Sequence, residues 1–173
     1  EDPGFFEAFF QLQQQDLWQG VSAFTLFCQF DRGFLKRLLS NHPVFLSRYL
    51  GLFQEALFHP IESAVSQQQT ALSYLVVDAE GVGVFQDALP LAPAILMYDP
   101  EVIARALIIP PGSAINPEVT ALDEMLHTQG LVFTSLRRNL MIQVLCCNSL
   151  LLHWLIKLNS DKVMDIFERL FQK

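Results

Sequence analysis

Basic residues are missing from the middle of this 173-residue chain, whose formal net charge is −7. Residues 49–104 contain no lysine or arginine, and outside this stretch acidic and basic residues balance. The stretch contains seven acids: Glu55, Glu62, Asp78, Glu80, Asp87, Asp99 and Glu101. A surface of negative charge repels phosphate groups and attracts cations. The absence therefore disfavours direct nucleic-acid contact here and favours a basic partner.

Charged residues of both signs are also scarce. They make up 17% of the chain, against about 25% in an average soluble domain. Hydrophobic residues make up 51%, so the chain has ample apolar surface to bury and disorder is excluded. Only 8 glycines, 9 prolines and 3 cysteines occur, which excludes collagen-like, low-complexity and disulfide-rich scaffolds.

The three cysteines are Cys28, Cys146 and Cys147. Their number is odd and two of them are adjacent, a poor geometry for an ordinary disulfide. This predicts a reducing compartment and hence an intracellular protein, cytoplasmic or nuclear. The chain starts with acidic residues, unlike the basic start of a secretory signal. Because residue 1 is glutamate and not methionine, we expect a processed or excised piece of a longer protein.

Sequence motifs for catalysis or metal binding are absent. We find no P-loop pattern, no H-E-x-x-H, no C-x-x-C and no G-x-S-x-G, and each of these carries a specific chemistry. The four histidines, His42, His59, His127 and His153, are scattered. The sequence therefore predicts a protein that is not an enzyme, with no catalytic residues, no cofactor and no metal. A helical enzyme or ligand carrier with an internal apolar cavity is the weakest alternative.

Apolar residues recur every three or four positions along most of the chain, which is typical of amphipathic helices. Strand-like alternation is not found, so we predict an all-α fold of about 8–10 helices. The predicted helices span 4–15, 16–30, 31–39, 43–58, 61–77, 100–108, 117–129, 131–158 and 160–171. Asp99-Pro100-Glu101, Asn116-Pro117-Glu118 and Asn159-Ser160-Asp161 carry helix-start signals.

Two architectures fit this pattern within a single α-helical domain, 1–173, in which 1–77 and 99–173 form sub-units joined by an irregular segment, 78–98. One is a compact bundle around a central buried helix. The other is a solenoid of antiparallel helix pairs. Pro43, Pro60, Pro100 and Pro117 each open a predicted helix. In general style this pairing resembles the armadillo and HEAT repeats, which implies an irregular α-solenoid segment of a scaffold.

Residues 139–156 form a run without formal charge between Arg138 and Lys157. Its length approaches that of a membrane-spanning helix. The run also contains Asn139, Gln143, Asn148, Ser149 and His153, each of which would need a partner in lipid. A helix buried in a helical domain is favoured, and a membrane-associated protein anchored through 139–156 remains the alternative.

The function that these features favour is protein–protein interaction. Eleven of the fifteen phenylalanines lie in the first 58 residues, and apolar faces this wide either form a core or dock onto another chain. We predict a non-catalytic scaffold or adaptor domain that binds a basic or amphipathic partner helix, or a short motif, in a groove between helices. The predicted apolar contacts are Phe5, Phe9, Trp18, Phe167 and Phe171. The predicted steering charges are Glu55, Glu62, Asp99 and Glu101.

Overall fold

The structure is a computed structural model that describes residues 3–14, 19–42, 44–61, 69–77, 94, 97–110, 118–126 and 148–171. Every regular element within these residues is a helix, which confirms the all-α prediction. The helices are α1 (Pro3–Phe10), α2 (Ala23–Phe30), α3 (Arg32–Asn41), α4 (Phe45–Arg48), α5 (Leu50–Phe58), α6 (Ala71–Leu75), α9 (Pro100–Ile108), α10 (Ala121–Leu126) and α12 (Ser149–Phe171).

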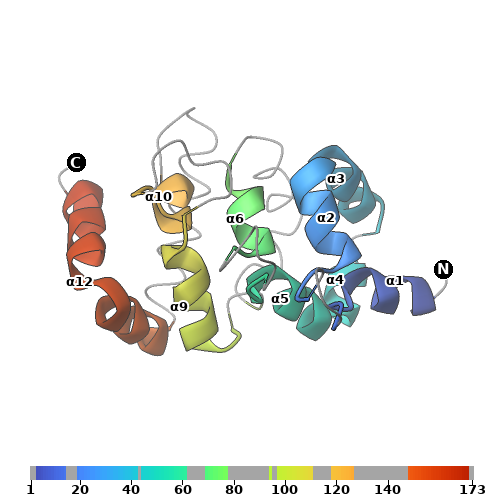
Figure 1. Ribbon diagram of the computed structural model, residues 1–173, viewed down its shortest axis with the longest axis horizontal. Helices are drawn as coiled ribbons and strands as arrows, with labels where there is room; N and C mark the ends of the chain where they lie inside the picture. The colour runs from blue at the N-terminus through green and yellow to red at the C-terminus, as the bar shows by residue number, and fades with distance from the viewer. Residues whose placement is uncertain are drawn as a thin grey trace.

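The helices form a row along the long axis of the molecule, in which α5, α6, α9 and α12 succeed one another (Figure 1). Helices α1 to α4 form one end of the row and α12 forms the other. Between them, α6 packs against α2 and α5, and α9 packs against α6, α10 and α12. One cluster of buried apolar side chains runs through the row, from Phe6 in α1 to Ile166 in α12.

The first two helices are shorter than predicted because a turn separates them. Gly20 has a positive φ of 77°, a conformation that costs glycine little. Its backbone N–H donates to the Gln13 carbonyl at 3.0 Å, and the Gln13 N–H donates to the Val21 carbonyl at 2.9 Å. Helix α2 then begins after Ser22, whose hydroxyl accepts the Thr25 N–H. A continuous helix from Asp16 to Phe30 is therefore wrong, since residues 19–22 are not helical.

Two further predicted helices, 43–58 and 61–77, are also wrong in part. Tyr49, at φ −114° and ψ 27°, separates α4 from α5, although the predicted end at Phe58 is confirmed. Helix α6 begins after Thr70, which forms a reciprocal capping box with Ser73. The Ile61 N–H donates to the Gln69 carbonyl at 2.7 Å. This bond closes the chain on itself, so a continuous helix from Ile61 is excluded.

Helix α9 follows the predicted signal: Asp99 caps it and Pro100 occupies its first turn. Helix α10 begins later than predicted, after Thr120. The Thr120 N–H donates to Asp123 Oδ2 at 2.8 Å, and the Asp123 N–H donates to the Thr120 hydroxyl at 3.2 Å. A reciprocal cap of this kind satisfies backbone donors that a helix start leaves free.

Helix α12 begins at Ser149, where Asn148 Oδ1 accepts the Leu151 N–H at 3.1 Å. One continuous helix over 131–158 is therefore wrong, since its C-terminal part has its own cap. Asn159, at φ −158° and ψ 84°, interrupts α12, and its Oδ1 accepts the Lys162 N–H. That second cap confirms the predicted helix start at Asn159. Residues 139–147 lie outside the described residues, and no helix among those described is long and apolar enough to cross a membrane.

Aromatic rings form the core at the α1–α5 end. Phe10, Phe24 and Phe53 are buried and contact one another, with ring centroids 5.2–5.8 Å apart. Phe9 packs edge-on against both Phe10 and Phe24. Aromatic pairs favour such tilted and edge-to-face geometries. These contacts join α1, α2 and α5 into one layer.

A polar cluster joins α10 to α12 at the other end. Lys162 Nζ lies 2.7 Å from Asp123 Oδ2 and donates to the Glu118 carbonyl at 3.1 Å. Asp123 Oδ1 is buried without a hydrogen bond, but Arg169 Nη2 lies 3.6 Å away. Burial alone would raise the pKa of Asp123, but the hydrogen bonds from Lys162 and Thr120 outweigh it and lower that pKa. The charge of Asp123 is therefore part of the fold.

Candidate functional site

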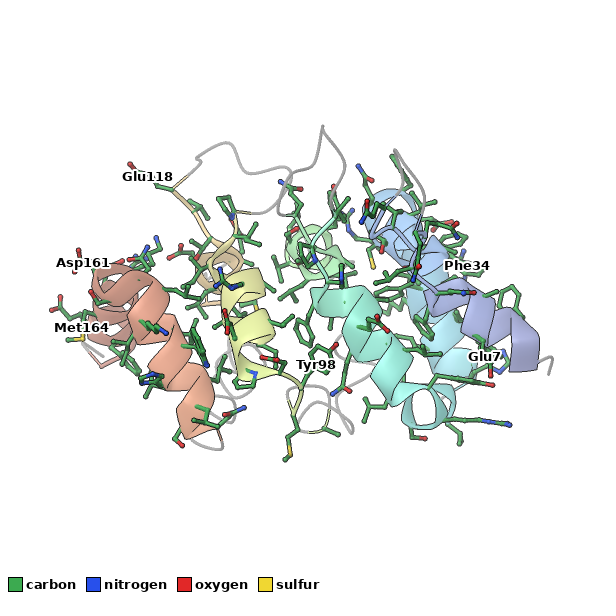
Figure 2. All side chains as sticks on the ribbon, turned by 60° about the horizontal axis from the view of Figure 1, so that its bottom comes forward. Glu7, Phe34, Tyr98, Glu118, Asp161 and Met164 are labelled. Carbon is green, nitrogen blue, oxygen red and sulfur yellow. The ribbon has the colours of Figure 1, made fainter. Side chains whose placement is uncertain are left out.

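Tyr98 lies at the junction of α5 and α9, as Figure 2 shows. Its ring stacks on Phe58 of α5, with the centroids 6.1 Å apart and the planes at 20°. Phe58 is buried, whereas Tyr98 is half-buried. One hydrogen bond, from Gln54 Nε2 of α5 to the Ala94 carbonyl at 2.7 Å, holds the chain before α9 against α5. The buried Phe58 of α5 therefore supports the Tyr98 ring on one side, and part of the ring stays exposed.

The charges of two carboxylates, from α5 and from the start of α9, act on the Tyr98 phenol. Glu55 comes from α5 and Asp99 caps α9, and both are exposed. Burial raises the pKa of the Tyr98 phenol, and the negative charges of Glu55 and then Asp99 raise it further. Asp99 is held in place because its Oδ1 accepts the backbone N–H groups of Glu101 and Val102 at 2.9 and 3.3 Å.

An exposed methionine completes the site. Met97 precedes Tyr98 and is 79% exposed, the highest value among the large apolar side chains of the described residues. We call Glu55, Met97, Tyr98 and Asp99 together the Tyr98 surface. A half-exposed aromatic ring together with exposed carboxylates can bind a cation through the face of the ring and through ion pairs. The flexible thioether of Met97 suits apolar contact with differently shaped partners.

The predicted acidic residues have different surroundings in the structure. The charges of Glu55 and Asp99 both act on the Tyr98 phenol. Glu101 instead pairs with Arg105 of the next helical turn, with its Oε1 2.7 Å from Nη2, so its charge is largely neutralised. Glu62 lies outside the described residues.

The predicted apolar contacts do not form one groove. Phe9 is 4% exposed and belongs to the core, so a partner cannot reach its ring; the wide apolar face of the first helix packs inward. Phe5 is 52% exposed and stacks on Phe9. Phe167 is half-buried against the core in α12, at the opposite end of the row from Phe5 (Figure 1). Trp18 and the side chain of Phe171 lie outside the described residues.

Sequence reasoning missed Met97 and Tyr98, although a signal was present. The pair directly precedes Asp99-Pro100, the clearest helix start in the chain. A residue just before an N-cap commonly packs beside the first turn, and methionine next to tyrosine there combines apolar area with a polar tip. What the sequence could not show is that the charge of Glu55, more than forty positions earlier, acts on the Tyr98 phenol.

Other reactive groups of the described residues offer little chemistry. Burial raises the pKa of the Cys28 thiol well above its usual value, so the thiol stays protonated and unreactive. Among the described histidines, the ring Nδ1 of His59 lies 3.0 Å from the Pro60 carbonyl. No three His, Cys, Asp or Glu side chains within the described ranges are arranged to hold a metal ion.

A shallow depression of about 460 Å³ lies beside the Asp123 cluster. Pro110, Glu118, Asp161 and Lys162 are among the residues that line it. Lys162 is already bound to Asp123 and to the Glu118 carbonyl, so the depression adds no free cation. The Tyr98 surface is therefore the better candidate.

Comparisons of the chain with protein-family models, with curated proteins and with solved structures found no match.

Proposed function

We propose that this protein is a non-catalytic, helical protein–protein interaction domain that binds a basic, amphipathic segment of a partner protein at the Tyr98 surface. The observation that supports this most directly is the partly exposed Tyr98 ring next to the exposed Met97, with the negative charges of Glu55 and Asp99 acting on the Tyr98 phenol. Apolar partner residues pack on Met97 and Tyr98. Lysine or arginine side chains of the partner lie against the carboxylates and the ring face.

The charges mainly set partner choice and the rate of encounter. Exposed ion pairs each contribute only about 0.2–1 kcal/mol, whereas complementary charge steers association and disfavours wrong partners. Residues 49–104 contribute no lysine or arginine to oppose a basic partner. Binding at this site should therefore weaken as ionic strength rises.

We propose that the row of helices is an irregular α-solenoid segment of a larger scaffold or adaptor. Helices α5, α6, α9 and α12 succeed one another along the long axis (Figure 1), as in repeat proteins where each layer contacts its neighbours. Reducing, intracellular surroundings are part of the proposal, because Cys28 is a free, buried thiol.

A binding assay with defined peptides tests the proposed function. The probe is a labelled synthetic peptide with leucine on one helical face and lysine on its flanks, and its control carries glutamate in place of lysine. The protein variant is Glu55→Gln with Asp99→Asn. Asparagine caps a helix as well as aspartate does, so the variant removes two charges and keeps α9. We expect fluorescence anisotropy to show binding of the lysine peptide weakened about tenfold.

The matched control is Glu7→Gln with Glu168→Gln, which removes two exposed charges from α1 and α12. It should leave the affinity within about twofold, since distant exposed charges are screened. Met97→Ser should weaken binding with no change in charge. Equal binding of the lysine and glutamate peptides, or equal losses in the two double variants, would overturn the proposal.

A further inference from the structure

Aromatic rings lie at the surface where α2 ends and α3 begins. Phe27 of α2 and Phe34 of α3 stack on each other, with ring centroids 4.5 Å apart and planes at 26°. Both are half-buried against the core, whereas Phe30, the last residue of α2, is 75% exposed. Figure 2 shows Phe34 at the α1–α4 end of the row. Because the core supports the stacked pair, a partner ring can pack beside it without first ordering these residues.

The exposed side of α3 adds positive charge next to these rings. Arg37 follows Phe34 by three residues, which places the two on the same side of the helix. Lys36 and Arg37 are both exposed, and neither forms an ion pair with a described residue. Arg32 differs, since its Nε donates to the Tyr74 carbonyl at 3.1 Å and joins α3 to α6. Lys36 and Arg37 are therefore the charges of α3 that a partner meets.

This part of the sequence is basic as a whole. Residues 17–54 contain a single acid, Asp31, and four bases: Arg32, Lys36, Arg37 and Arg48. All five charged residues lie within the described ranges. Asp31 is the N-cap of α3, and its Oδ1 accepts the Phe34 N–H at 2.8 Å. Complementary charge therefore favours an acidic partner here.

We propose that Phe30, Phe34, Lys36 and Arg37 form a second binding surface, the α3 surface, for a short acidic segment of a partner protein that carries an aromatic residue. The partner's ring packs on Phe30 and Phe34, and its carboxylates pair with Lys36 and Arg37. Clusters of basic residues recognise acidic motifs in this way. The proposal does not rest on the Tyr98 surface, whose charge has the opposite sign.

A protein segment fits the charge of the α3 surface better than a nucleic acid does. Affinity for a nucleic acid depends on how many phosphates the bases of a protein neutralise, and the α3 surface has two exposed bases. The chain as a whole carries a net charge of −7, which repels a long polyanion. A short segment with a pair of carboxylates needs no more than Lys36 and Arg37.

Fluorescence anisotropy with a labelled short peptide tests the proposal. The probe contains one tryptophan between aspartates, and its control carries lysine in place of aspartate. Lys36→Gln with Arg37→Gln should weaken binding of the aspartate peptide about tenfold. Phe30→Ser should weaken it by a similar factor with no change in charge. All three side chains are exposed, and circular dichroism will verify that the variants fold.

The matched control is Arg105→Gln with Lys157→Gln, which removes two exposed bases from α9 and α12. It should leave the affinity for the aspartate peptide within about twofold, since distant exposed charges are screened. Glu55→Gln with Asp99→Asn should not weaken this binding, so failure of the α3 surface and failure of the Tyr98 surface are distinguishable. Equal binding of the aspartate and lysine peptides, or equal losses in the two variants that remove bases, would contradict the proposal.

Two other occupants are tested on the same proteins. A single-stranded oligonucleotide that binds more tightly than the aspartate peptide, and is weakened by Lys36→Gln with Arg37→Gln, would assign the α3 surface to nucleic acid. Sedimentation velocity that shows wild-type self-association, abolished by the same variant, would assign it to a second copy of this chain. Either result would overturn the proposal.

Discussion

The two ends of the molecule are held together by different chemistry. At the α1–α5 end, tilted phenylalanine rings such as Phe10, Phe24 and Phe53 pack against one another. At the α10–α12 end, aliphatic side chains are supplemented by the ion pair of Asp123 and Lys162. Apolar burial does not titrate, whereas an ion pair does. Changes in pH and salt should therefore alter the stability of the α10–α12 end and barely alter that of the α1–α5 end.

The largest loss of stability is expected from a substitution at the aromatic α1–α5 end. Phe24→Ala removes a ring that contacts Phe9, Phe10 and Phe53. Large core truncations of this kind cost about 3–5 kcal/mol, measured here by urea unfolding. Phe30→Ala on the same helix is the control and should cost less than about 0.5 kcal/mol, since Phe30 is 75% exposed. Similar costs for the two would mean that the rings do not form the core.

A smaller loss of stability, which depends on pH, is expected at the α10–α12 end. Asp123→Asn should reduce the free energy of unfolding at neutral pH by about 1–3 kcal/mol, because Asp123 accepts charge-assisted bonds from Lys162. The pKa of Asp123 is lowered in the folded protein. Its stabilisation is therefore present above the unfolded-state pKa of about 3.9 and is lost as pH falls through the lower, folded-state value.

Unfolding of wild type and Asp123→Asn at neutral and acid pH measures this contribution. The difference in the free energy of unfolding between the two proteins should narrow as pH falls below about 4. The difference in the free energy of unfolding between wild type and Phe24→Ala should stay constant over the same pH range. A constant difference for Asp123→Asn would show that the carboxylate charge does not stabilise the fold.

The smallest loss of stability is expected at the start of α6, which lies between the two ends. Thr70→Ala removes the hydroxyl that accepts the Ser73 N–H and should cost about 1 kcal/mol. Thr70→Ser keeps a hydroxyl and should restore most of the loss. Thermal unfolding of the three proteins gives the comparison. If serine and alanine destabilise equally, the methyl group of Thr70 and not its hydroxyl is what matters.

Much of the helix pattern could be predicted, because local signals decide it. Asp99-Pro100 and Asn159 each start a helix where the sequence predicts. The missed boundaries at Ser22, Thr70 and Thr120 share one cause: each is a Ser or Thr whose cap depends on a residue three positions later. Such short polar residues favour caps and loops alike, so hydrophobic spacing alone does not place them.

The candidate site was less predictable, because it depends on contacts between distant residues. Glu55 and Asp99 stand out in sequence as acids in a stretch without bases, and on that ground the sequence predicts them as binding residues. Their shared ring, Tyr98, requires knowing that α5 and α9 are neighbours. Phe9 illustrates the reverse error: an aromatic residue near a terminus suggests incomplete packing, but Phe24 and Phe27 of α2 pack against it.

The burial of Cys28 gives the protein a built-in protection against oxidation. Its sulfur is enclosed in α2, within the aromatic end, and burial keeps it in the thiol form. Oxidants and alkylating reagents attack the thiolate, so they reach this atom only when the aromatic layer opens. The rate at which Cys28 is modified thus reports how often that layer separates, without any engineered label.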